Sequence, residues 1–201
     1  MATEIDICNL ALGHLGDSAT VVSISPPEGS AQAEHCSRFY PIARDSLLEV
    51  HLWNFAARRV RAADIAGDWP GWLYAYAVPA DCLRLVAVVP ADALDAVAQP
   101  YVVEQLPSGA ANVVLTNTAS AVLRYSARVA DTAMFSPLFV LSLSWHLAAM
   151  LAGPVIKGDA GAAEAKRCTQ MMANYLGQAA GADANQRSIR REHVVPWTAG
   201  R

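Results

Sequence analysis

The sequence contains few charged residues. Asp, Glu, Lys and Arg make up only 16% of its 201 residues, whereas hydrophobic residues make up 54%. Soluble domains usually carry about 25% charged residues, so we expect much of this surface to be covered by a core, a partner or a membrane. The net charge of -3 also lacks the basic excess with which proteins hold nucleic acid.

Paired cysteines and a leader-type N-terminus are also missing. No two of the four cysteines (Cys8, Cys36, Cys82 and Cys168) are near enough in sequence for a zinc knuckle or a redox pair. Three of them fall in apolar helical stripes, where a reduced thiol behaves as a small hydrophobic group, so we expect a reducing compartment. The chain opens on an acidic helical pattern, and we expect no secretory signal.

Catalytic motifs are lacking as well. There is no Walker loop, GxGxxG or GxSxG. Gly16-Asp17-Ser18 resembles the nucleophile block of GDS-type esterases. That chemistry needs a base from an Asp-x-x-His block, and no Asp in this sequence stands three residues before a His. The end of a helix followed by a turn is therefore the favoured interpretation. The five histidines are scattered, and adjacent His35 and Cys36 would point about 100° apart on a helix. We expect no catalytic residues, no metal and no cofactor.

One uncharged run raises the question of a membrane. Residues 132–156 contain no Asp, Glu, Lys or Arg. By length alone, a run of this size could cross a bilayer. Pro137 and Pro154 confine the helix to about 16 residues, ending near Leu151, and neither flank is strongly basic. Small or polar residues recur at helical spacing along it: Ser142, His146, Ala149 and Gly153. We therefore expect a buried helix in contact with other helices, and no membrane.

Helical patterns occupy both ends of the chain. Thr3 and Asp6 resemble a capping box before a helix that stops at Gly16. Ser30 begins a second helix, in which Pro41 predicts a kink or a restart because an interior proline costs about 3 kcal/mol. Ser136-Pro137 begins the third helix, and a fourth, rich in alanine, spans 159–183.

The middle of the chain changes to a strand pattern. Residues 53–61 fit a helix poorly and indicate an exit into extended chain. About five strands are then predicted within 72–79, 83–89, 101–104, 113–116 and 121–129. In the last of these, Val122, Arg124, Ser126 and Arg128 alternate with apolar residues, which predicts one wet face.

These patterns predict an α+β fold in three parts. A helical bundle of about four helices comprises residues 1–57 and 132–184, an inserted antiparallel β-region of about five strands comprises 58–131, and an extended C-terminal docking tail comprises 185–201. The tail alternates arginines with isolated apolar residues. Its candidate docking residues are Arg187, Ile189, Arg190, Arg191, Val194, Val195 and Trp197.

Five blocks in the first 85 residues carry a resemblance to a known family. They are Ile7-Cys-Asn-Leu-Ala-Leu-Gly-His-Leu-Gly16, Ala33-x-x-Cys36-x-x-Phe-Tyr40, Arg44-Asp-x-Leu-Leu48, His51-x-Trp53-Asn-Phe-Ala56 and Tyr74-x-Tyr76-x-x-Pro79-x-Asp81-Cys-Leu-Arg84. Their order and spacing are similar to the tail tubular protein A, or head-to-tail adaptor, family of podovirus-type bacteriophages. The resemblance covers roughly residues 3–183; the β-region from 90 to 130 and the C-terminal tail match only in general character.

The resemblance implies a structural virion protein and not an enzyme. Family members form a ring, typically of twelve copies, in the tail or neck of the virion, between the portal protein and the tail nozzle (tail tubular protein B). Tail fibres or spikes are further expected partners, and assembly is expected in the host cytoplasm. DNA would pass through the channel without being held, which a mildly acidic chain favours. Arg187, Arg190 and Arg191 could pair with acidic portal residues, and Trp197 could anchor in a pocket.

Two other interpretations stay open. Some members of the family have been proposed to degrade cell-wall or capsule polysaccharide, and Asp64, Asp68 and Asp81 lie near the aromatic stretch, although spacing alone cannot place them across a sugar bond. Arg58, Arg59 and Arg61 could touch phosphate, but a solvated strand edge or an ion pair between subunits fits them equally well.

Overall fold

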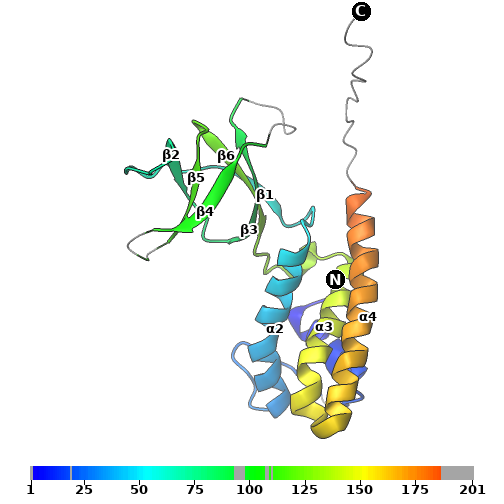
Figure 1. The fold of residues 1–201 in the computed structure, drawn as a ribbon. Helices are drawn as coiled ribbons and strands as arrows, with labels where there is room; N and C mark the ends of the chain where they lie inside the picture. The colour runs from blue at the N-terminus through cyan, green and yellow to red at the C-terminus, as the bar shows by residue number, and fades with distance from the viewer. Residues whose placement is uncertain (1, 19, 93–97, 107–108, 110, 187–201) are drawn as a thin grey trace, which may run out of the picture.

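The computed structural model describes residues 2–18, 20–92, 98–106, 109 and 111–186, and within them the fold is α+β, as predicted (Figure 1). Four α-helices and six strands lie in the order helix, helix, strands, helix, helix. The helices are α1 (Glu4–His14), α2 (Ala31–Val50), α3 (Pro137–Ile156) and α4 (Gly158–Ala184), with a 3-10 turn, η1 (Thr132–Met134), before α3. The strands are β1 (Ala57–Arg61), β2 (Tyr74–Ala77), β3 (Cys82–Pro90), β4 (Tyr101–Gln105), β5 (Asn112–Thr116) and β6 (Ala121–Ala127).

Three helices begin where the sequence places a capping residue. The Thr3 hydroxyl accepts from the Asp6 amide at 3.1 Å, and the Asp6 carboxylate accepts from the Thr3 amide at 2.8 Å, which completes the predicted capping box. Ser30 and Ser136 accept from the amides three residues on. These contacts satisfy amide groups that the first helical turn leaves without partners.

Both interior prolines lie within continuous helices. α2 runs through Pro41 without a restart, and the Pro41 side chain is exposed. α3 runs through Pro154 to Ile156, five residues beyond the predicted end at Leu151. Lys157 then reverses the chain at φ +63° and donates its amide to the Gly153 carbonyl. α4 follows at once, so α3 and α4 form a tight antiparallel pair.

α3 is the central helix of the helical core. Phe139, Leu143, Leu147 and Leu151 are fully buried among residues of α1, α2 and α4. By length and composition, α3 is the one helix in the described part of the chain that could cross a membrane, and 56% of its most apolar window is buried inside the structure. Its apolar surface is therefore covered largely by the chain's own helices.

The six strands form two three-stranded antiparallel sheets. The strand orders are β1-β6-β3 and β2-β5-β4. Between the sheets lies a small core of Tyr76, Val88, Val114, Ala121 and Leu123. Backbone hydrogen bonds join the sheets at two corners, from Ile65 to Ala75 (2.8 Å) and from Gln99 to Val88 (2.8 Å). These bonds connect the chain beside one sheet to a strand of the other, so the two sheets pack as one β-region.

The structure differs from the sequence prediction at two strands. The prediction of about five strands omitted β1, whose Ala-Arg-Arg-Val-Arg sequence is exposed at four of five positions and so carries no apolar alternation. Ser126 was assigned to the wet face of β6, but it is fully buried. The C-terminal end of α2 covers that part of the sheet, and Ser126 donates to the Leu48 carbonyl at 2.8 Å.

Candidate functional site

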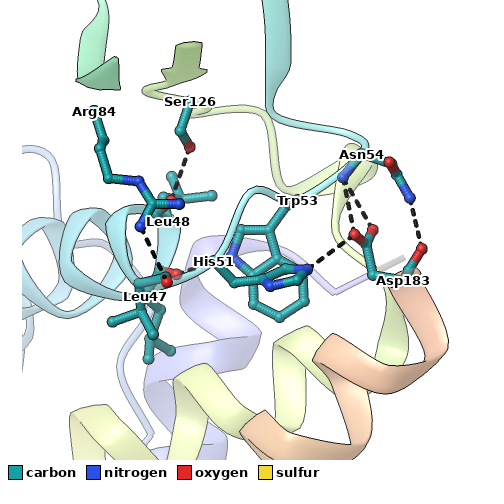
Figure 2. A network of polar contacts seen from close by, with 9 residues as sticks. Leu47, Leu48, His51, Trp53, Asn54, Arg84, Ser126 and Asp183 are labelled. Atoms are coloured by element: carbon teal, nitrogen blue, oxygen red, sulfur yellow. Dashed lines mark hydrogen bonds and ion pairs between the residues drawn. The ribbon is translucent and has the colours of Figure 1, made fainter. Parts of the chain in front are cut away.

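The polar side chains that converge most strongly lie where α2 ends, β1 begins and α4 ends, a region that we call the joint (Figure 2). It comprises His51, Trp53, Asn54, Arg84, Ser126 and Asp183, together with the last carbonyls of α2. The joint connects the helices to the sheets and lies at the end of α4, just before the predicted docking tail.

The free carbonyls at the end of α2 hold the β-region in place. A helix leaves its last four carbonyls without helical partners. The Trp53 indole donates to the Leu47 carbonyl at 2.8 Å, and Ser126 donates to the Leu48 carbonyl. Arg84 of β3 reaches the Val50 carbonyl at a longer 3.4 Å. Ser126 and Arg84 thereby join the first sheet to the end of α2, and Trp53 holds the chain that leaves the helix.

Asp183 performs the matching role at the end of α4. Its side chain is 10% exposed. The carboxylate accepts from the Asn54 amide at 3.0 and 3.2 Å and lies 3.2 Å from His51 Nε2. In return, the Asn54 side-chain amide donates to the Asp183 carbonyl at 2.6 Å. Asn54 and Asp183 therefore clamp the C-terminal end of α4 to the chain that leaves α2.

Two half-buried aspartate clusters extend the joint. Asp45 of α2 accepts from Arg44 at 2.8 Å and from Arg128, just after β6, at 2.7 Å. Asp81 accepts from Arg58 of β1 at 2.5 Å and from the Tyr125 hydroxyl at 3.0 Å. Burial, and then the hydrogen bond to Asp81, raise the pKa of Tyr125. Such half-exposed ion pairs are individually worth only about 0–1 kcal/mol, so together they orient the parts more than they stabilise them.

Two histidines tie α3 to its neighbours. His14, at the end of α1, stacks on Trp145 with ring centroids 3.6 Å apart, and its Nε2 lies 3.0 Å from the Ser144 hydroxyl. His146 Nε2 lies 3.0 Å from the Ser46 hydroxyl of α2. Burial lowers the pKa of both histidines, with Arg167 adding to the effect at His14. Both are therefore neutral at pH 7 and serve as packing groups.

Cys82 and Cys168 are poor nucleophiles in this structure. Cys8, Cys36 and Cys168 are buried, and Cys82 is half-buried. Burial, followed by a nearby carboxylate, raises the pKa of Cys82 and of Cys168 to about 11. Because the thiolate is the reactive form, these two thiols are essentially unreactive at neutral pH.

The residues of the polysaccharide interpretation do not share one arrangement. Asp64 and Asp68 are exposed on the chain between β1 and β2, whereas Asp81 is engaged by Arg58 and Tyr125. Gly16-Asp17-Ser18 follows α1, with Gly16 at φ +75°, as the turn interpretation requires. In the ranges that the structure describes, no three His, Cys, Asp or Glu side chains are grouped so as to hold a metal ion.

The predicted docking residues all lie outside the described residues. These are Arg187, Ile189, Arg190, Arg191, Val194, Val195 and Trp197. Their role stays a prediction. Sequence reasoning did not single out Asp183 or Ser126 as polar anchors, because their partners lie 129 and 78 residues away in the chain.

The five sequence blocks behind the family resemblance supply both core residues and contacts at the joint. Ile7, Cys36 and Tyr40 are core residues. The charged members after position 43 lie at the joint or in its two aspartate clusters. No protein-family model matches the chain, and no curated protein is significantly similar to it.

Proposed function

We propose that this chain is a head-to-tail adaptor of a podovirus-type bacteriophage, a structural ring subunit between portal and tail nozzle. The observation that carries the proposal is the use made of the polar motif residues. Arg44, Asp81 and Arg84 contact backbone or opposite charges within the chain. These contacts, with that of Arg128 to Asp45, join the helices to the first sheet within one subunit, which suits a structural connector.

The outer face of α4 supports packing against sister copies. From Thr169 to Ala182 this helix has no charged residue, although most of the small and polar side chains on its outer face are exposed. A ring closes through head-to-tail contacts that use two different patches of each subunit. An uncharged face of small residues permits such close helix contact, and we assign it to one side of the subunit.

The remaining elements of the proposal follow from the resemblance. The ring comprises about twelve copies in the virion neck, contacts portal protein, nozzle and possible fibres or spikes, and lets DNA pass without specific contact. Assembly takes place in the host cytoplasm, and neither cofactor nor membrane takes part. Residues 187–201 supply the docking arm for the portal.

Co-sedimentation with purified portal rings tests this proposal. The full chain should travel with the portal, and a chain ending at Gln186, which keeps every contact of the joint, should stay behind while remaining folded by circular dichroism. Equal binding by both chains would remove the docking-arm role, and binding by neither would contradict the adaptor function.

Hydrolysis of cell-wall or capsule polysaccharide is the alternative function. A zymogram on cell-wall material distinguishes it from the adaptor. Clearing by the wild-type chain that disappears in Asp64→Asn or Asp81→Asn would establish an enzyme. We expect no clearing by any of the three proteins.

A further inference from the structure

A second feature of the joint is an apolar groove on its outer side. The groove has a volume of about 360 Å³ and lies between η1, the beginning of α3 and the end of α4. Apolar side chains dominate its lining: Phe55, Met134, Phe135, Pro137, Leu138, Ala179 and Ala182. This volume is at the lower end of the roughly 300–1,000 Å³ of ligand pockets, so the groove suits one large side chain.

The groove leaves apolar surface uncovered in the described part of the chain. Met134 is 53% exposed, although it stands beside Phe135 and Phe55 at the edge of the main core. Exposing a large apolar side chain forgoes roughly 1.5–3 kcal/mol of burial. A groove of this kind therefore favours an apolar occupant.

The position of the chain indicates which occupant that is. Gln186, the last described residue, itself lines the groove, so the remaining 15 residues start at its edge. They carry Trp197 and four arginines but only one acidic residue. The lining residues include Asp183 and no Lys or Arg, and Asp131 caps the adjoining turn η1. Charge and hydrophobicity thus match between groove and segment.

We propose that, in the chain free of portal, Trp197 of the same chain occupies this groove, with arginines of residues 187–201 beside Asp131 and Asp183. Ten residues lie between Gln186 and Trp197, and the eleven steps from one Cα to the other can span up to about 36 Å when extended, which is ample to turn back. A short tether also gives a millimolar effective concentration, which favours the chain's own segment over that of another copy. Tryptophan is a frequent anchor in such pockets.

Photo-cross-linking of the full chain, purified without portal, tests the proposal. Trp197 is replaced by p-benzoylphenylalanine, and the irradiated protein is analysed on a denaturing gel and by peptide mass spectrometry. The expected product is a single-chain species linked to residues 134–138 or 179–183. Met134→Asp in the same background should lower its yield at least tenfold. Leu73→Asp, at a residue 72% exposed on the β2 side of the molecule, should leave the yield unchanged.

Three outcomes would overturn the proposal. They are links between two chains, links to a different surface, and a yield that Met134→Asp does not change. Because no portal is present, none of them bears on the adaptor function, which co-sedimentation decides separately.

Discussion

At the scale of single residues, buried polar groups show where the molecule is constrained. Asp183 is the clearest case, since one carboxylate holds the end of α4 through Asn54 and His51. A buried donor that loses its acceptor costs about 1–3 kcal/mol. The role of Asp183 could not be predicted from the local sequence. It stands at the end of the predicted helix, before a polar stretch, and its partners lie far away in the chain.

Replacing Asp183 with Ala should destabilise the fold by about 1–3 kcal/mol, because the Asn54 amide loses its acceptor in a half-buried position. Urea unfolding followed by circular dichroism measures the change. Asp159→Asn, at an exposed position in the first turn of α4, serves as the matched control and should change stability by less than about 0.5 kcal/mol. Equal stability of the two variants would show that the clamp contributes nothing.

His146 should make stability depend on pH in a specific window. Burial lowers its pKa in the folded state, so the unfolded chain binds more protons, and stability falls as the pH drops below the unfolded value of about 6.5. The melting temperature should therefore fall between pH 7 and pH 5.5, a range that lies above the titration of the carboxylates.

His146→Gln isolates this effect, because glutamine can still bond to Ser46 but does not titrate. Its melting temperature should fall less over the same range than that of the wild type, with the remaining decrease arising at His14. An identical decrease in both proteins would locate the pH dependence elsewhere.

At the scale of elements, the helix beginnings were predictable and the helix contacts were not. Thr3, Ser30 and Ser136 cap their helices through neighbours three residues away, so the signal is local. The end of α3 was harder to predict, because the helix continues through Pro154 to Ile156 instead of stopping before the proline. β1 was missed because its strand conformation depends on a partner that is distant in the sequence. β6 pairs with it from Ala57 to Arg61.

Gly161 illustrates a contact between elements. A Cβ at this position would lie 2.9 Å from the Ala152 carbonyl oxygen of α3, whereas one at Gly177 would meet nothing within 4 Å. Gly161→Ala should therefore destabilise the α3–α4 pair by about 1–3 kcal/mol through forced displacement. Gly177→Ala should stabilise the chain by roughly 0.5–1 kcal/mol through helix propensity. Thermal unfolding compares the two, and a Gly161→Ala protein as stable as Gly177→Ala would refute the close approach.

At the scale of the whole molecule, low charge has two explanations. Part of it is internal, because the uncharged helix α3 lies in the core with 56% of its most apolar window buried. The remainder is on the surface, where the outer side of α4 carries small uncharged residues. The low charge predicted that much of the apolar surface would be buried. Within the subunit, the packing of α3 accounts for part of that burial. We propose that assembly with other copies covers the outer side of α4.

The most direct measurement of the central proposal is negative-stain imaging of the purified chain mixed with portal rings. We expect a second ring stacked on the portal, with the same rotational symmetry axis and density for the β-region beside the helices of each subunit. A chain that stays monomeric at high concentration and leaves the portal bare would contradict the adaptor function.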